Sequence, residues 1–168
     1  MSRLRMHFAG LRGLRTFWHA ERGAALVESA IILPVFLVLV GAVYEFAFFL
    51  YQEQLATAGV RDAARYLALT ADPNGSVIQT AAKNLAVTGS VQGGPTRIAG
   101  WSTGDVIVSV SAIDNSAGMF SGGSTVQIVT VSTSFVDPSL GFLGLVGLNR
   151  PTISASHQER YVGGSAPG

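Results

Sequence analysis

The chain has 168 residues, of which 48% are hydrophobic and only 12% are charged. This length suffices for one domain and a membrane anchor, and the charge is low for a wholly soluble domain. The absence of cysteine excludes disulfides, thiolate metal sites and a cysteine nucleophile. The formal charge of +1 hides an asymmetry, because residues 1–22 carry a net charge of +4 and residues 24–168 a net charge of −3. The positive charge therefore belongs to an N-terminal leader and does not indicate that the chain binds nucleic acid.

A long apolar segment follows the leader. Residues 24–51 contain only two formal charges, Glu28 and Glu45. Counted over residues 29–51, the segment has about 23 residues, or about 34 Å of helix, which is enough to cross a hydrocarbon core of about 30 Å. Pro34 removes one backbone hydrogen bond, so we expect a kink or local melting there. The sequence predicts a transmembrane helix that spans the lipid at about residues 29–51.

The basic residues predict how this helix is oriented. The leader holds five arginines, whereas the two arginines of residues 52–70 are balanced by two acidic side chains. Positively charged segments stay on the cytoplasmic side. We therefore expect a single-pass protein with a cytoplasmic N-terminus and with residues 52–168 outside the cytoplasm.

The helix is expected to continue past the membrane to about Thr70. Alanine-rich composition favours helix in this region, and the turn sequence at residues 72–75, with Pro73 and Asn74-Gly75, ends it. A short helix over about residues 77–87 follows. The sequence thus predicts a helical segment 24–70 and an extracytoplasmic domain 71–168.

Four charged residues on the long helix are candidate contacts with a partner helix: Glu45, Arg61, Asp62 and Arg65. The more ordinary alternatives remain open. Glu45 would then lie in water at the outer interface, and the two arginines would form a solvated face or pair locally with Asp62.

Beyond the short helix, the periodicity changes to that of strands. Valine, isoleucine and threonine dominate three segments, residues 106–113, 125–135 and 152–162. Such segments predict a small antiparallel sheet of about three strands. The expected fold class is α+β, with a long N-terminal membrane-spanning helix that continues outward, one short helix and this sheet.

Three further segments are less regular. The glycine-rich residues 90–104 have room for a short strand around Ile98. Residues 140–148 alternate leucine, phenylalanine and valine with glycine, and two readings stay open: packing beneath the sheet, or contact with the membrane surface. The tail, residues 163–168, is expected to be disordered.

The junction between leader and apolar segment reads Arg22-Gly23-Ala24-Ala25-Leu26-Val27-Glu28. This motif, the apolar span with Pro34 and the helical run up to Arg65 resemble the TadE-like family, minor pseudopilins of the tight-adherence (Tad, Flp-type) pilus system. The resemblance is strongest over residues 20–70. It implies that a prepilin peptidase cuts between Gly23 and Ala24, removes the leader 1–23 and leaves Glu28 as the fifth residue of the mature chain.

The resemblance also implies partners and a location. The partners would be the prepilin peptidase, other pilin-like subunits, the Tad inner-membrane assembly machinery and membrane lipid. The location would be the bacterial inner membrane, and whether the subunit also enters the adhesion pilus stays open. No cofactor, metal, nucleic acid or small-molecule substrate is implied.

The chemistry of the motif agrees with this reading. A charge in the bilayer core costs roughly 2.5–3.5 kcal/mol on insertion scales. Cleavage would create an ammonium at Ala24, four residues before Glu28 and on the same helix face. At 4 Å the attraction is about 4 kcal/mol for an effective dielectric of 20, which offsets much of that cost.

Other classes of protein remain as alternatives. An uncleaved signal anchor would make the chain a single-pass scaffold or binding protein of the cell envelope. A cleavable secretory signal fits less well, because the apolar segment runs on into a long helix. A tethered enzyme is the third alternative. The sequence contains no nucleophile-elbow motif, no phosphate-binding glycine loop and no histidine pair outside the leader, so we expect no enzyme.

Overall fold

The computed structural model describes residues 11–121 and 123–163, and its first element is one long helix, α1 (Leu11–Leu69). This helix begins well before Ala24, where the sequence predicted its start, because leucine, arginine, alanine and glutamate in the leader favour helix. α1 is helical on both sides of Pro34. The kink expected there stays a prediction.

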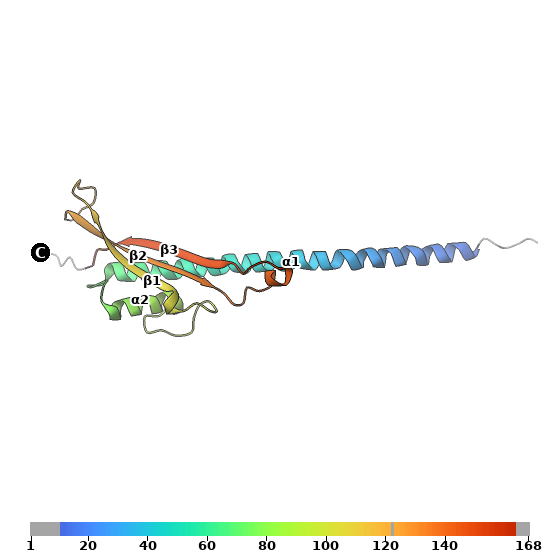
Figure 1. Cartoon of the computed structure of the whole chain (residues 1–168), viewed down its shortest axis with the longest axis horizontal. Coiled ribbons are helices and arrows are strands. Elements are labelled where there is room, and N and C mark those ends of the chain that lie inside the picture. Colours follow the sequence, from blue (N-terminus) through green and yellow to red (C-terminus); the bar gives the residue numbers. More distant parts are fainter. Residues whose placement is uncertain (1–10, 122, 164–168) are drawn as a thin grey trace, which may run out of the picture. The chain divides into compact units, whose positions relative to one another are not determined.

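The chain divides into two compact units, Met1–Val43 and Tyr44–Gly168. The last part of α1 therefore belongs to the same unit as the elements that follow it. These are α2 (Ser76–Thr88), the 3-10 turns η1 (Thr103–Asp105) and η2 (Leu143–Val146), and the strands β1 (Val106–Asp114), β2 (Thr125–Val136) and β3 (Thr152–Arg160) (Figure 1). The predicted α+β fold, with a long helix, one short helix and three strands, is confirmed.

The three strands form an antiparallel sheet in the order β1-β2-β3. Val110 lies opposite Val129 in the first pair, and Val131 lies opposite His157 in the second. β2 is thus the central strand, and from Val129 to Phe135 every second residue is buried. This period of two places one face of the sheet on the core. Segments 106–113 and 125–135 had been expected almost to the residue, whereas the third strand ends at Arg160 and not at residue 162.

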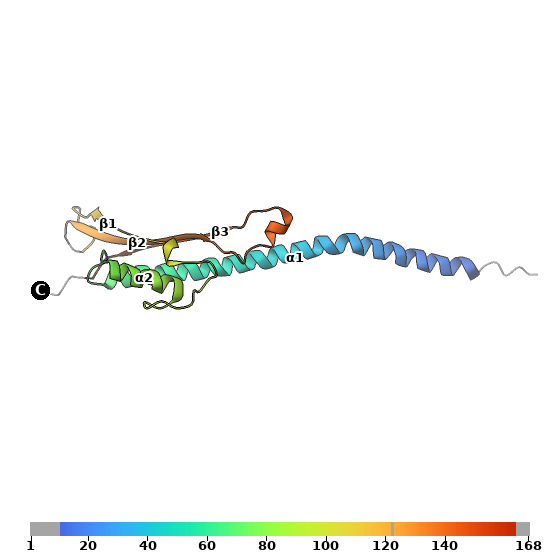
Figure 2. The same cartoon turned by 60° about the horizontal axis from the view of Figure 1, so that its bottom comes forward.

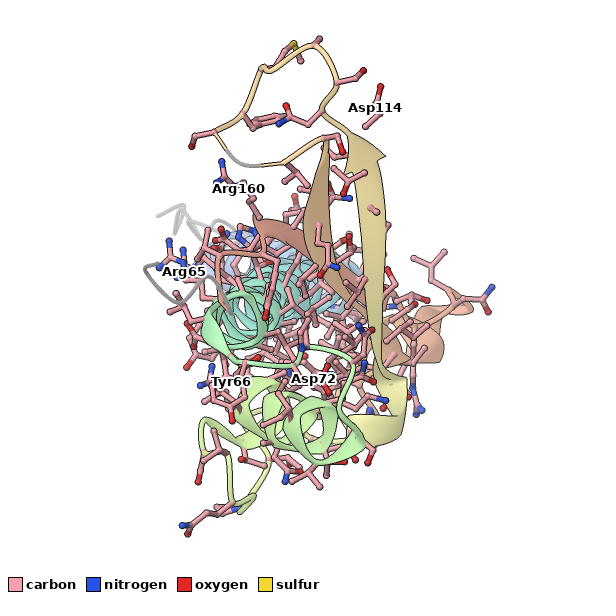
Figure 3. The ribbon with its side chains drawn as sticks, turned by 90° about the vertical axis from the view of Figure 1, so that its left-hand side faces the viewer. Arg65, Tyr66, Asp72, Asp114 and Arg160 are labelled. Carbon is pink, nitrogen blue, oxygen red and sulfur yellow. The ribbon has the colours of Figure 1, made fainter. Side chains whose placement is uncertain are left out.

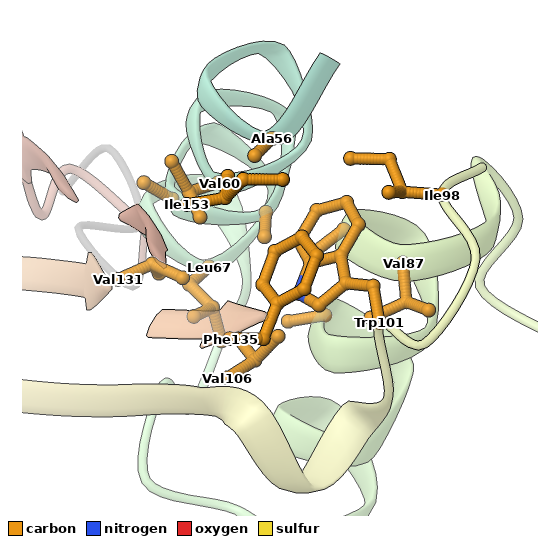
Figure 4. Close-up of a cluster of buried hydrophobic side chains, with 14 of the residues drawn as sticks. Ala56, Val60, Leu67, Val87, Ile98, Trp101, Val106, Val131, Phe135 and Ile153 are labelled. Atoms are coloured by element: carbon orange, nitrogen blue, oxygen red, sulfur yellow. The ribbon is translucent and has the colours of Figure 1, made fainter. Parts of the chain in front are cut away.

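The core of the second unit lies between this face of the sheet and the two helices, as Figure 2 shows for α1, α2 and the strands. α1 contributes small side chains at helical spacing, and α2 and the sheet close around them. The buried residues include Ala56, Val60, Ala63, Ala64, Leu67, Ala86, Val87, Val129, Val131, Phe135 and Ile153 (Figure 4). Each fully buried valine, leucine, isoleucine or phenylalanine contributes about 1.5–3 kcal/mol. The unit therefore has a true hydrophobic core.

The contact between α1 and α2 is close because Gly59 has no side chain. A Cβ atom at Gly59 would lie 2.5 Å from the carbonyl oxygen of Ala86 and 2.7 Å from Cη2 of Trp101. The indole of Trp101 stacks on Phe135 with ring centroids 5.4 Å apart, and its Nε1–H donates to Oγ1 of Thr133 at 2.9 Å. Glycine at this position lets α2 and the indole approach the backbone of α1.

The three irregular segments, residues 90–104, 140–148 and 163–168, have different structures or lie partly outside the described residues. The described segment 90–104 contains no strand, and Ile98 packs into the core from a loop. In the segment 140–148, Leu140 is buried while Leu145 is 81% exposed. One end of this segment thus packs into the core and the other does not. Apart from Gly163, the tail expected to be disordered lies outside the described residues.

Candidate processing and assembly site

Gly23 and Ala24, the two residues of the predicted cleavage site, lie within α1 and are exposed. A Cβ atom built on Gly23 would meet nothing within 4 Å. The described part of the chain therefore leaves this peptide bond uncovered. The bond is helical, however, so a peptidase that needs an extended strand has to unwind α1 locally.

Glu28 follows one helical turn after Ala24, so that the two residues share a face of α1. Its side chain is exposed, as is every residue from Gly23 to Val40. The structure shows no hydrogen bond or ion pair at Glu28 among the residues it describes. The carboxylate is therefore free to meet a group that another molecule, or a new chain terminus, supplies.

The residues around Pro34 expose large apolar side chains on all sides of α1. Leu33, Phe36, Leu37 and Leu39 are each more than half exposed. Soluble monomers rarely expose so long an apolar surface, which is typical of a membrane span or a helix that packs against partners. By length and composition, α1 over Gly23–Leu69 is the one described helix that qualifies as a candidate membrane span. These features fit a single-pass membrane anchor.

Residues 23–65 resemble a known family. They match the family model described as TadE-like protein, and the match begins at Gly23, the first residue of the predicted cleavage site. The predicted resemblance is thereby confirmed for this segment, and the family points to a minor pilin-like protein associated with the Tad pilus. No curated protein and no solved structure gives a match to the chain.

Within the second unit, the TadE-like segment carries a buried acid. Glu45 is only 4% exposed, and its Oε1 accepts a hydrogen bond of 3.1 Å from the backbone N–H of Phe142. The two residues are far apart in sequence, so the contact ties the start of the second unit to the loop before β3. This arrangement differs from the alternative in which Glu45 lies in water at the outer interface. No sequence signal identifies a backbone donor such as Phe142.

The other predicted helix contacts are brought to neighbours within the chain. Nη2 of Arg97 lies 3.5 Å from Oδ2 of Asp62, and Nε of Arg65 lies 3.3 Å from Oε1 of Glu159 on β3. Arg61 is exposed. Whether a partner helix also uses any of these residues stays a prediction.

The Arg65–Glu159 pair includes a third group. Nε2 of His157 lies 3.0 Å from the same Oε1 of Glu159. The hydrogen bond with His157, followed by the one with Arg65, lowers the pKa of Glu159 below its usual value. Figure 3 shows Arg65 and Arg160 on the same side of the second unit, where they line a shallow hollow. Because Arg65 is 64% exposed, its ion pair contributes little to stability.

The end of α1 is held by the chain that follows β3. The carbonyl oxygen of Ala68 accepts hydrogen bonds from the backbone N–H groups of Val162 and Gly163, at 2.9 and 2.8 Å. The hydroxyl of Tyr161 donates to the carbonyl oxygens of Thr70 and Ala71. Carbonyls at the end of a helix have no partner within the helix. The contacts at Ala68 satisfy one of them, and Tyr161 holds the two residues that follow α1. The sequence does not predict these contacts, because a single tyrosine and backbone groups form no recognisable motif.

Proposed function

We propose that the chain is a minor pilin-like subunit that a prepilin peptidase cuts between Gly23 and Ala24, and that takes part in assembly of a Tad/Flp-type adhesion pilus. The observation that carries the proposal is the start of the TadE-like match at Gly23. This glycine also marks the boundary between the arginine-rich leader and the apolar helix. The proposed location is the bacterial inner membrane, with the leader in the cytoplasm and the second unit outside it.

The role of Gly23 follows from its conformational freedom. Glycine costs about 0.8–1.0 kcal/mol relative to alanine inside a helix, so it weakens α1 where the peptidase has to unwind it. Its lack of a side chain also lets an extended backbone approach the peptidase closely. Gly23→Ala therefore opposes cleavage in two ways, by strengthening the helix and by adding a methyl group.

The role of Glu28 follows from its position and exposure. After cleavage, the ammonium of Ala24 and the carboxylate of Glu28 share one face in the first turn of the mature helix. A negative charge at a helix N-terminus is also favoured by the helix dipole. Alternatively, the ammonium comes from a neighbouring subunit, in which case the pair sets the axial register between two packed helices. In either case the acid acts in assembly, and we propose no enzymatic activity for the chain.

The first experiment is mass spectrometry of the membrane-inserted protein from cells with and without the cognate peptidase. We expect a mature chain that begins at Ala24 only when the peptidase is present. Gly23→Ala should leave the full-length chain, whereas Gly41→Ala, a matched glycine replacement later in α1, should be cut normally. Intact leader on most wild-type molecules in piliated cells would refute processing.

The second experiment separates processing from assembly. Glu28→Gln keeps the size of the side chain and removes its charge, so we expect normal cleavage and strongly reduced piliation. Glu53→Gln on the same helix is the matched control and should assemble normally. Normal piliation by Glu28→Gln would eliminate the pairing with an ammonium while leaving the cleavage itself intact.

A second candidate function is an uncleaved scaffold anchored in the membrane. The observation that favours it is the unbroken helical assignment of α1 through Gly23. It predicts the same mass for wild type and Gly23→Ala whether or not the peptidase is present.

A further inference from the structure

Two parts of the second unit that are far apart in sequence expose apolar side chains at one place. On α1, Tyr44 and Phe46 are 71% and 61% exposed. In the loop between β2 and β3, Leu145 and Leu148 are 81% and 57% exposed. The hydrogen bond from the N–H of Phe142 to Glu45, the residue between Tyr44 and Phe46, holds the loop against this part of α1. In Figures 1 and 2 the η2 turn, in orange, lies beside α1.

The backbone of this loop is suited to an apolar environment. Within the η2 turn, the N–H groups of Gly144, Leu145 and Gly147 donate to the carbonyl oxygens of Gly141, Phe142 and Gly144, at 3.1, 3.0 and 3.2 Å. Unpaired backbone groups are what make most irregular loops costly in lipid. Three N–H groups of this loop are therefore paired within the loop itself, which lowers that cost.

The position of the loop along α1 coincides with the end of the uncharged run. Residues 29–44 contain no formal charge, and Glu45 is the first charged residue after Glu28. A hydrocarbon core of about 30 Å takes about 20 residues of helix. If Glu28 is near one boundary, about 20 residues of helix place the other near Phe48, within one helical turn of Glu45 and its attached loop.

The side chains at this level are those expected at a lipid boundary. The rings of Tyr44, Phe48 and Tyr51 form a row on α1, with neighbouring centroids 6.4 Å apart. Aromatic side chains of this kind gather at membrane interfaces. Arg150 is exposed at the end of the loop and supplies a cation that suits lipid phosphates.

We propose that the loop 141–150 is a second membrane contact, in which Leu145 and Leu148 enter the edge of the lipid beside α1. This inference goes beyond the proposed pilus function and depends only on the insertion of α1 in a membrane. The rival occupant is a helix of another subunit. The lipid is the better match, because the loop lies beside an aromatic row and carries an exposed arginine at the level where the uncharged run of α1 ends.

The absence of cysteine allows a clean test. Leu145→Cys in the full chain would be labelled with a nitroxide, and the protein reconstituted in phospholipid vesicles. The measurement is the ratio of collision rates with oxygen, which concentrates in lipid, and with a water-soluble nickel chelate. Leu37→Cys marks the proposed span. Met119→Cys is the matched control, because Met119 is 79% exposed but lies in the loop at the opposite end of β2, about 37 Å of strand away.

We expect the Leu145 label to show a ratio several-fold above that of the Met119 label and closer to that of Leu37. A Leu145 label that is open to the nickel chelate, with Leu37 in lipid, would overturn the proposal and leave the span intact. Shielding of Leu145 from both reagents would mean a protein occupant and would also overturn it. A Leu37 label in water would refute membrane insertion and with it both proposals.

A second variant tests how the loop is held. Glu45→Ala removes the carboxylate that accepts the hydrogen bond from Phe142. In this background the ratio for Leu145 should fall toward that of Met119, while the ratio for Leu37 stays unchanged. An unchanged ratio at Leu145 would contradict the role of Glu45 in placing the loop at the lipid.

Discussion

Replacing Gly59 by alanine tests whether the packing of α2 on α1 depends on the absence of one methyl group. The new Cβ atom would lie 2.5 Å from the carbonyl oxygen of Ala86, whereas ordinary contacts begin at about 3.4 Å. The obstacle is backbone, so α2 as a whole has to move by close to 1 Å. The indole of Trp101, at 2.7 Å, blocks a second direction.

Two opposite effects set the size of the change. Overpacking of a tight site costs about 1–3 kcal/mol, and alanine in place of glycine gains about 1 kcal/mol of helix propensity. We therefore expect Gly59→Ala to lower the free energy of unfolding by up to about 2 kcal/mol. Gly59→Val adds two more carbons to the same space and should cost more than alanine.

The assay is denaturant unfolding of the full chain in detergent, followed by the fluorescence of Trp101 in a Trp18→Phe background. Gly104→Ala is the control, because its new Cβ atom would meet only Oγ of Ser102, at 3.5 Å. A Gly59→Ala protein that is more stable than wild type by about 1 kcal/mol would behave like an unpacked helix. That result would refute the close contact.

Three further outcomes are expected from denaturant unfolding, followed for Trp101→Phe by far-UV circular dichroism because that variant lacks the fluorescent indole. Leu67→Ala should lower stability by about 2–5 kcal/mol, because Leu67 is fully buried, whereas Leu69→Ala, at a residue 71% exposed on the same helix, should change it little. Trp101→Phe removes the hydrogen bond that the indole donates to the buried hydroxyl of Thr133 and should cost about 1–3 kcal/mol, although this hydroxyl keeps the bond that it donates to the carbonyl oxygen of Asp105. The hydrogen bond from His157 lowers the pKa of Glu159 in the folded state. The stability that this shift contributes is therefore present above the usual carboxyl pKa of about 4.3 and is lost as pH falls through the lowered value. Glu159→Gln should therefore slightly flatten the fall in stability below that pH, and an unchanged pH profile would contradict the hydrogen bond.

The sequence predicts the elements of this fold well where periodicity and turn chemistry agree. The strand pattern around Val129 has a period of two, and the turn at Pro73 stops α1. Both signals act over a few residues and need no knowledge of the rest of the chain. The start of α1 was misplaced because the search for an apolar segment passes over a charged leader that is also a good helix former.

The sequence does not predict the contacts that fix the two ends of the α1 portion in the second unit. Glu45 meets a backbone N–H in a glycine-rich loop, and Tyr161 meets carbonyl oxygens at residues 70 and 71. Backbone groups are the same in every residue, so no residue type identifies them as partners. Only the fold, which brings the ends of β2 and β3 to α1, makes these partners visible.

The two acids of the apolar segment have similar local sequences, but the tertiary structure gives them different surroundings. Glu28 and Glu45 look alike in the sequence, as single carboxylates at the two ends of an uncharged run. Glu45 is buried and hydrogen-bonded within its own unit, whereas Glu28 is exposed on a helix whose described neighbours supply no donor. A carboxylate that the lipid buries is costly unless it is paired. The partner of Glu45 comes from the fold, and we infer that the partner of Glu28 comes from proteolysis or from a neighbouring subunit, which makes Glu28 the acid whose replacement should affect assembly and not folding.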